Sequence, residues 1–139
     1  MIIVDTGFWL AIANDRDKHH QQAKRSLLQV KEPSITTWCV VTETCYLLLK
    51  QLGNPAQVKF IDSLGSGTPQ IFDLQPAHIS RVSALMRQYS DLPMDLADAS
   101  LVILAEHLDN GRILSVDQRD FNTYRWKNTH PFQNLMFNS

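Results

Sequence analysis

The sequence is poor in cysteine and glycine, carries almost no net charge and lacks a long apolar run. It contains two cysteines and five glycines in 139 residues, and 13 basic residues nearly balance 14 acidic ones. No apolar run reaches the roughly 18 residues that a membrane span needs. The balanced charge excludes the basic footprint of a tight, non-specific nucleic-acid binder. A chain of this length can also bury a core without covalent staples.

The cysteines and the first residues indicate the cellular compartment. Cys39 and Cys45 fall in one predicted helix, where six residues of rise separate their Cα atoms by roughly 9 Å, too far for a disulfide. We expect two reduced, mostly buried thiols and no zinc site. The opening Met1-Ile2-Ile3-Val4-Asp5 shows neither a basic leader nor a cleavage site. The sequence therefore predicts a cytoplasmic protein without membrane partners.

Strand-like and helix-like segments alternate along the chain. At 44% hydrophobic residues, the composition predicts a folded protein of a single domain over residues 1–139. Alternating segments of this kind favour an α/β fold with a mostly parallel sheet. The predicted strands are 2–4, 34–37, 70–72, 112–116 and 133–137, and the predicted helices are 6–13, 19–30, 40–52, 55–64, 76–89 and 94–108, with a short helix inside 117–124.

Two aspartates follow directly on apolar strands. Asp5 comes after the run 2–4, and Asp117 comes after the run 113–116. In parallel α/β sheets, ligands bind outside the carboxyl ends of the strands, so both side chains are candidates for a site. Each residue also precedes a helix, where Asp is a favoured N-cap. The pattern leaves both interpretations open.

A second pair of acids lies in the helix after Pro93. Asp95 and Asp98 are three residues apart, so they share one face of that helix. Glu106 and Asp109 fall on the same side, which is also the pattern of a solvated stripe. Asp98 is harder to explain as a surface residue, because it lies in the most apolar helix of the chain.

A fifth carboxylate stands alone in an apolar helix. Glu43 is the only charged residue between Pro33 and Lys50, so it is either at a boundary or paired. Separate segments thus each offer a carboxylate in apolar surroundings. An all-oxygen cluster suits Mg²⁺ or Mn²⁺ better than zinc. Phosphodiester hydrolysis uses such ions to activate water and stabilise the leaving oxygen.

His19 and His20 are adjacent and point apart, so we interpret them as solvated or capping residues.

Four stretches, in this order along the chain, resemble the PIN-domain ribonucleases, and among them the VapC-type toxin subunits of bacterial type II toxin–antitoxin pairs. They are Ile-Ile-Val-Asp5-Thr, Thr42-Glu43, Met94-Asp95-Leu-Ala-Asp98-Ala and Leu114-Ser-Val-Asp117-Gln-Arg-Asp120-Phe. The resemblance implies a three-layer α/β/α sandwich around a central parallel sheet of four to five strands. The first and fourth strands would be adjacent, which would bring Asp5 and Asp117 side by side.

The resemblance also implies a site and an activity. The activity would be Mg²⁺- or Mn²⁺-dependent endonucleolytic cleavage of RNA. Members of the family commonly form homodimers and are neutralised by a small antitoxin that covers the active site. The implied catalytic and metal-binding acids are Asp5, Glu43, Asp98 and Asp117, with Asp95 and Asp120 as extra or substitute ligands and Thr6 and Ser115 as hydroxyls that line the site. Asp117 and Asp120 compete for the fourth position, and we prefer Asp117 because it abuts the strand.

The basic residues and the aromatic ones near them are concentrated after the acidic block. Residues 91–110 contain no Lys or Arg, and the residues that we predict to contact RNA phosphates follow them: Arg112, Arg119, Arg125 and Lys127. The alternative is two ordinary solvated surfaces. We expect Tyr124 and Trp126 in core or dimer packing, with base stacking as the alternative.

Two other functions remain compatible with the residues. One is a non-catalytic subunit of the same fold whose acidic pocket docks an Arg or Lys of a partner protein. The other is a DNA-directed nuclease of related architecture, against which the short chain argues because it offers no obvious DNA-clamping element.

Overall fold

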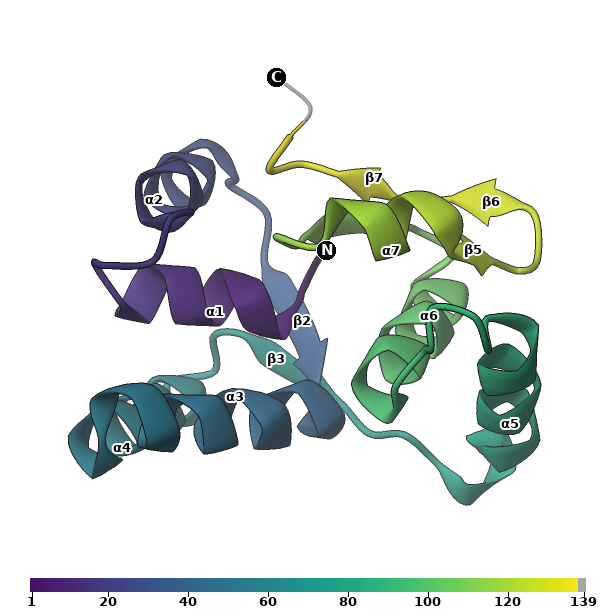
Figure 1. Cartoon of the computed structure of the whole chain (residues 1–139), viewed down its shortest axis with the longest axis horizontal. Helices are drawn as coiled ribbons and strands as arrows, with labels where there is room; N and C mark the ends of the chain where they lie inside the picture. The colour runs from purple at the N-terminus through teal and green to yellow at the C-terminus, as the bar shows by residue number, and fades with distance from the viewer. Residues whose placement is uncertain (138–139) are drawn as a thin grey trace.

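Five parallel strands form the central sheet of the computed structural model, which describes residues 1–137 (Figure 1). The spatial order is β3-β2-β1-β4-β7, and every pairing in it is parallel. The strands are β1 (Ile2–Val4), β2 (Ser34–Thr37), β3 (Gln70–Phe72), β4 (Arg112–Leu114) and β7 (Gln133–Asn134). The expected adjacency of the first and fourth strands is confirmed, and all carboxyl ends meet at one edge.

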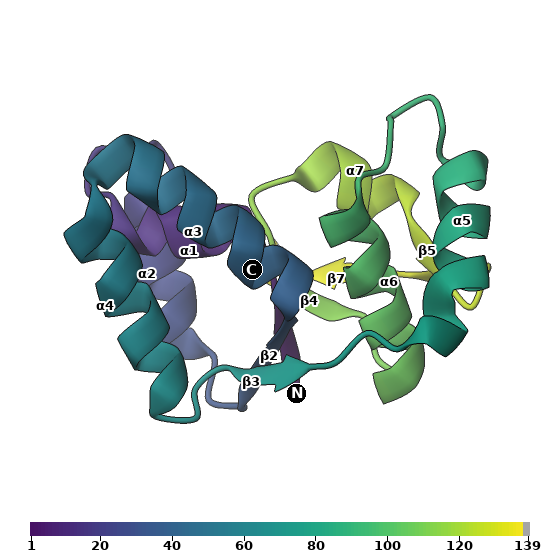
Figure 2. The ribbon, with the colours of Figure 1, turned by 90° about the horizontal axis from the view of Figure 1, so that it is seen from below.

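Helices cover both faces of this sheet, as the predicted sandwich requires. Figure 2 shows α1 to α4 on one side of the strands and α5 to α7 on the other. The helices are α1 (Thr6–Ala13), α2 (His20–Gln29), α3 (Trp38–Leu52), α4 (Asn54–Gly65), α5 (Ile79–Gln88), α6 (Leu96–Leu108) and α7 (Gln118–Thr123), with a 3₁₀ turn, η1 (Pro76–His78), before α5.

The central strand β1 is apolar throughout because both of its faces are buried. Ile3 and Ile113 point to one face and join the core formed with α5 and α6. Ile2 and Val4 point to the other face and pack with Phe8 of α1. Because neighbouring side chains alternate between the faces, three residues of β1 contribute to both cores. The central strand is thereby fixed in place, and so is the residue that follows it.

Side-chain caps decide where two helices begin, and the predicted starts are wrong there. The helix expected from Met94 begins at Leu96, since Asp95 is its N-cap. The helix expected from Val40 begins two residues earlier, since Thr37 accepts a hydrogen bond from the Val40 N–H. Other predicted bounds also differ: the strands 112–116 and 133–137 end at Leu114 and Asn134, and the helix 76–89 divides into η1 and α5.

An antiparallel hairpin after α7 was absent from the sequence-based prediction. It consists of β5 (Arg125–Trp126) and β6 (His130–Pro131). Two-residue strands are too short to show an alternating pattern, which explains why the sequence does not indicate them. Tyr124 and Trp126 are buried, which confirms their expected place in the core.

Two expectations concern single features. Cys39 and Cys45 are free, but both are half-buried rather than mostly buried. Over residues 1–137, the helices are all too short or too polar to cross a membrane.

Candidate active site

Six carboxylates line one cavity at the carboxyl edge of the sheet. Its volume is about 330 Å³, and its lining residues include no Lys, Arg or His. The acids come from the loops after β1 and β4 and from α3, α6 and α7: they are Asp5, Glu43, Asp95, Asp98, Asp117 and Asp120. Acids from distant parts of the chain therefore face a common space, together with Thr6.

Ser115 connects the two acids that follow the central strands. Its Oγ donates to Asp5 Oδ2 at 2.9 Å and accepts from the Asp117 N–H at 3.0 Å. The Asp5 N–H also donates to the carbonyl of Leu114, at 3.1 Å. Ser115 is fully buried, so this arrangement is held inside the protein. The hydroxyl that was expected to line the site thus orients the carboxylate of Asp5.

Three of the acids are helix N-caps as well as lining residues. Each accepts a hydrogen bond from a backbone N–H in the first turn of its helix, which satisfies a donor that the helix cannot pair internally. The bonds run from Thr6 N to Asp5 Oδ1 (2.7 Å), from Asp98 N to Asp95 Oδ1 (2.8 Å) and from Asp120 N to Asp117 Oδ1 (3.0 Å). The two interpretations left open by the sequence are therefore compatible, because capping places these acids at the cavity.

Tyr124 holds Asp98 through a hydrogen bond that sequence reasoning missed. Its hydroxyl donates to Asp98 Oδ2 at 2.7 Å, and the residue is fully buried. Its ring packs edge-on against Phe121 and Tyr89, which fixes the position of the phenol. Burial, followed by this bond to Asp98, raises the pKa of Tyr124 far above its usual value. A buried tyrosine implies a partner for its hydroxyl, but the sequence does not say which.

Burial makes the negative charge of the cavity unfavourable. Desolvation raises the pKa of Asp5 to about 6, and the charges of Glu43 and Asp117 contribute in the same direction. Desolvation also raises the pKa of Asp98 to about 8, with the charge of Asp5 as the next cause. The pKa of Asp117 is raised as well, mainly by burial. These acids retain protons at pH values where surface carboxylates have lost them.

Asp120 forms an ion pair with the neighbouring Arg119. Arg119 Nε lies 3.0 Å from Asp120 Oδ1, and the Arg119 side chain is largely exposed. Among residues 1–137, no ion pair includes Asp5, Glu43, Asp98 or Asp117. Asp117 and Asp120 both line the cavity, but Arg119 forms its ion pair with Asp120 and only lowers the pKa of Asp117 slightly through its charge.

The lining suits a hard divalent cation by its chemistry. Within the described part of the chain, no three His, Cys, Asp or Glu side chains are arranged so that they could hold a metal ion. The donors are nevertheless all oxygens, and Thr6 adds a buried hydroxyl, Oγ1, without a hydrogen-bond partner. Repulsion separates like charges, and a cation among them would offset it.

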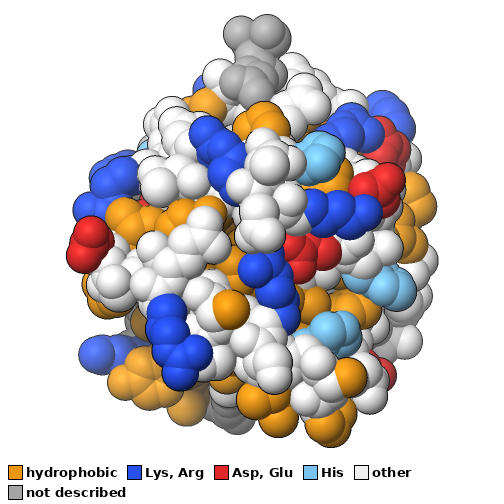
Figure 3. Space-filling view, turned by 90° about the vertical axis from the view of Figure 1, so that its right-hand side faces the viewer, with side chains coloured by type: hydrophobic (Ala, Val, Ile, Leu, Met, Phe, Trp, Pro, Cys, Tyr) orange, Lys and Arg blue, Asp and Glu red, His pale blue; other side chains and the backbone are white. Residues whose placement is uncertain are grey.

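The four predicted RNA contacts lie in different places. Arg112 pairs with Glu32 at the amino end of β4, on the opposite edge of the sheet. Lys127 Nζ lies 2.7 Å from Asp109 Oδ1, and Arg125 donates to three backbone carbonyls. Figure 3 shows the face over α5 and the hairpin, where basic and acidic side chains lie next to one another. Arg119 lines a cavity that adjoins the acidic one.

Gly7 allows α1 to lie against the segment that carries Asp117. A Cβ at this position would overlap with the Val116 Cγ2 atom, which a stiff β-branched side chain cannot move far. We expect Gly7→Ala to lower the free energy of unfolding by about 1–3 kcal/mol through overpacking, despite the higher helix propensity of alanine. Urea unfolding measures this change.

Gly65 offers a matched control for that variant. It ends α4, and a Cβ there would meet nothing within 4 Å. Gly65→Ala should therefore be neutral or slightly stabilising, and Gly7→Ala combined with Val116→Ala should recover part of the lost stability. Equal midpoints for Gly7→Ala and the unmodified protein would show that α1 does not need this close approach.

Fold and site together define an α/β protein with an acidic cavity at the carboxyl edge of its parallel sheet. The family model of the PIN domain matches residues 2–127, so the chain belongs to the PIN-domain family. It is 25% identical over 124 residues to ribonuclease VapC26 of Mycobacterium tuberculosis, covering 89% of this chain and 92% of that protein.

A solved structure supports the same fold. The crystal structure of VapC20 of Mycobacterium tuberculosis, described as a sarcin–ricin loop cleaving toxin, superposes with a TM-score of 0.80. The match has 22% identity and covers 86% of this chain and 92% of that one. The resemblance to PIN-domain proteins of the VapC type is therefore confirmed, as is the α/β/α fold that it implied.

Proposed function

We propose that this chain is a metal-dependent endoribonuclease, the toxin subunit of a toxin–antitoxin pair, and that the acidic cavity is its active site. The observation that carries this proposal is the cavity lined by six carboxylates and no basic residue. The names of the two relatives, a ribonuclease and an RNA-cleaving toxin, support the same reaction.

Each part of the cavity has a role in this proposal. When bound, Mg²⁺ or Mn²⁺ would supply activation of water and stabilisation of charge on the leaving oxygen. Ser115 and Tyr124 orient two of the acids through their hydroxyls. Thr6 contributes a residue with a hydroxyl to the wall of the cavity, beside Asp5. The residues that would hold the ion are Asp5, Glu43, Asp98 and Asp117, with Asp95 and Asp120 as further ligands.

The proposal extends to partners and location. RNA is the substrate, and a small antitoxin that covers the acidic cavity would silence the activity. We place the protein in the cytoplasm, as a homodimer of chains that each form one PIN-like nuclease domain over residues 1–139. The uncompensated negative charge of the cavity supports an antitoxin that inserts a basic side chain there.

The direct test is cleavage of RNA with Mn²⁺ or Mg²⁺. Total bacterial RNA, which includes ribosomal and transfer RNA, should give discrete fragments on a gel. We expect Asp5→Asn to reduce cleavage at least about 100-fold, since it removes a charge that the ion needs. Asp62→Asn, on the exposed surface of α4, is the matched control and should cleave normally. The proposal would be excluded if the unmodified protein cleaved no RNA and its gel pattern were the same as that of Asp5→Asn.

A second function is favoured by one observation. No three described side chains are arranged to hold a metal ion, which also suits a cavity that docks an Arg or Lys of a partner protein. Calorimetry distinguishes the two, because a docking subunit would give no heat with Mn²⁺ or Mg²⁺. A parallel reaction with single-stranded DNA tests the DNA-directed alternative.

A further inference from the structure

A second cavity adjoins the acidic one and has a different charge. Its volume is about 580 Å³. Lys18 and Arg119 line it, beside His19 and the acids Asp17 and Asp117, and we call it the basic cavity. It shares walls with the acidic cavity, namely Gly7, Leu10, Val116 and Asp117. Positive side chains therefore begin where the acidic lining ends.

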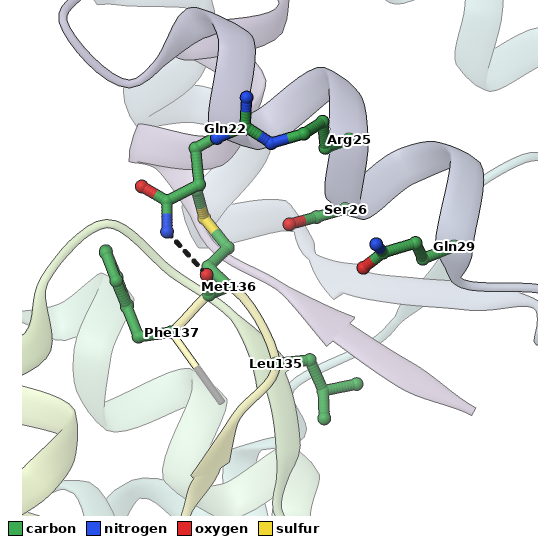
Figure 4. A pocket seen from close by; sticks show the side chains of 7 residues that line it. All are labelled: Gln22, Arg25, Ser26, Gln29, Leu135, Met136 and Phe137. Carbon is green, nitrogen blue, oxygen red and sulfur yellow. Dashed lines mark hydrogen bonds between the residues drawn. The ribbon is translucent and has the colours of Figure 1, made fainter. Parts of the chain in front are cut away.

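Helix α2 continues this surface without any acidic residue. Its sequence, His20–Gln29, contains two basic residues and neither Asp nor Glu. A third cavity, of about 300 Å³, lies between α2 and the segment 135–137 (Figure 4). The helix lines it with residues three or four positions apart, which share one face: Gln22, Arg25, Ser26 and Gln29. Gln22 Nε2 donates to the carbonyl of Met136 at 2.6 Å, which holds the two walls together.

The basic cavity and the α2 cavity meet at an aromatic contact. The ring of His19, in the basic cavity, lies edge-on to the ring of Phe137, in the α2 cavity, with 6.2 Å between their centroids. The acidic, basic and α2 cavities therefore follow one another across the surface. Polar and basic side chains line the basic cavity and the α2 cavity. Apart from Asp117, which the basic cavity shares with the acidic one, Asp17 is the only acid among their described lining residues.

We propose that a single-stranded stretch of RNA runs from the acidic cavity through the basic cavity and along the α2 cavity. The inference rests on the proposed function, because it assumes that the phosphate to be cleaved lies among the carboxylates. Those carboxylates repel the neighbouring phosphates, which need cations just beyond the reaction site. Lys18 and Arg25 supply such contacts, and amide side chains such as Gln29 bond to phosphate or ribose oxygens. Phe137 offers a ring for an unpaired base.

Binding without cleavage tests this path. We would measure the fluorescence anisotropy of a labelled 12-nucleotide single-stranded RNA of random sequence, in EDTA. Lys18→Ala and Arg25→Ala should each weaken binding about three- to tenfold and reduce the slope of log affinity against log salt by about 0.7. Arg119 is left intact, because it pairs with Asp120 and its loss would alter the acidic cavity.

The chain offers two matched controls. Lys24 is next to Arg25 on α2 but does not line the cavity, and Lys59 lies on α4. Lys24→Ala and Lys59→Ala should bind within twofold of the unmodified protein. If Lys18→Ala and Arg25→Ala match these controls, or if the unmodified protein binds no RNA, the path is wrong. If the protein bound polyglutamate as tightly as it binds the RNA, the path would also be wrong, since the surface would then hold any acidic chain.

The assay separates this inference from the function on which it rests. It contains no divalent ion and needs no cleavage. If the protein cleaves RNA while the two variants bind like the controls, the path fails and the nuclease stands. If the variants lose binding while no RNA is ever cleaved, the RNA path stands and the nuclease assignment fails.

Discussion

Replacing Asp98 with asparagine should make the protein more stable and inactive. Burial and the charge of Asp5 raise the pKa of Asp98 to about 8, so the folded protein favours the neutral form of this side chain. Asparagine is neutral and can still accept the hydrogen bond of Tyr124. We expect the free energy of unfolding at pH 8.5, without metal, to rise by about 2 kcal/mol, a value reduced for the partial exposure of the side chain.

The effect depends on pH in a defined direction. Because the folded pKa of Asp98 is raised above the ordinary value of 3.8, its neutral form stabilises the protein fully below pH 4. That stability is lost as the pH rises through about 8, where the buried group must ionise. Asparagine does not titrate, so the advantage of Asp98→Asn should grow from near zero at pH 4.5 to its full value at pH 8.5. Urea unfolding at both pH values measures it.

The control and the activity assay complete this prediction. Asp62→Asn removes an exposed charge and should change the free energy of unfolding by less than about 0.5 kcal/mol. Cleavage of RNA by Asp98→Asn should fall at least about 100-fold, as expected for a ligand of the ion. An equal or lower stability of Asp98→Asn at pH 8.5 would mean that the cavity solvates this carboxylate well.

A higher stability of Asp98→Asn would mean that the cavity keeps its carboxylates at a cost to the stability of the protein. Each buried negative charge lowers the stability of the metal-free protein, and neighbouring charges increase the effect. The fold tolerates the charges because caps and hydroxyls offset part of their burial. Function, rather than stability, accounts for carboxylates at these positions.

The sequence predicts the acids of the site where local rules place them. Asp5 follows a buried strand, and the carboxyl end of that strand lies at the cavity in the structure. Asp98 is three residues from Asp95, and both line the same cavity, as their helical spacing indicates. Parallel strands and helices obey short-range periodicity, which explains why the predicted strands and helices follow one another in the correct order, although the β5–β6 hairpin is missing from the prediction.

The remaining features depend on contacts between distant residues. Tyr124 reaches Asp98 across 26 positions, and no local pattern pairs them. Arg112 belongs to the basic stretch of the sequence but begins β4, so the parallel sheet carries it to the edge opposite the acids. Lys18 and Arg119 form one cavity only because α1 and the β4–α7 connection pack together. Charge patterns along a chain do not contain this information.

The affinity for Mn²⁺ should fall steeply as the solution becomes more acidic. The pKa of Asp5 is raised to about 6 and that of Asp98 to about 8, both chiefly by burial. A carboxylate must lose its proton to bind a cation, so each bound ion should release about one proton near pH 7, mainly from Asp98. We expect the affinity to fall about tenfold per pH unit between pH 7.5 and 6.5, and more steeply below pH 6, where Asp5 also becomes protonated.

Titration calorimetry in two buffers of different ionisation enthalpy measures both quantities. The difference in heat gives the number of protons released, and the change of affinity with pH gives the same number independently. Asp62→Asn should behave like the unmodified protein. In Asp98→Asn the binding should be weaker overall but nearly independent of pH between 7.5 and 6.5, because the group that titrates in this range is gone. An affinity for Mn²⁺ that stays constant from pH 7.5 to 5.5 in the unmodified protein would show that the ion binds elsewhere than among these buried acids.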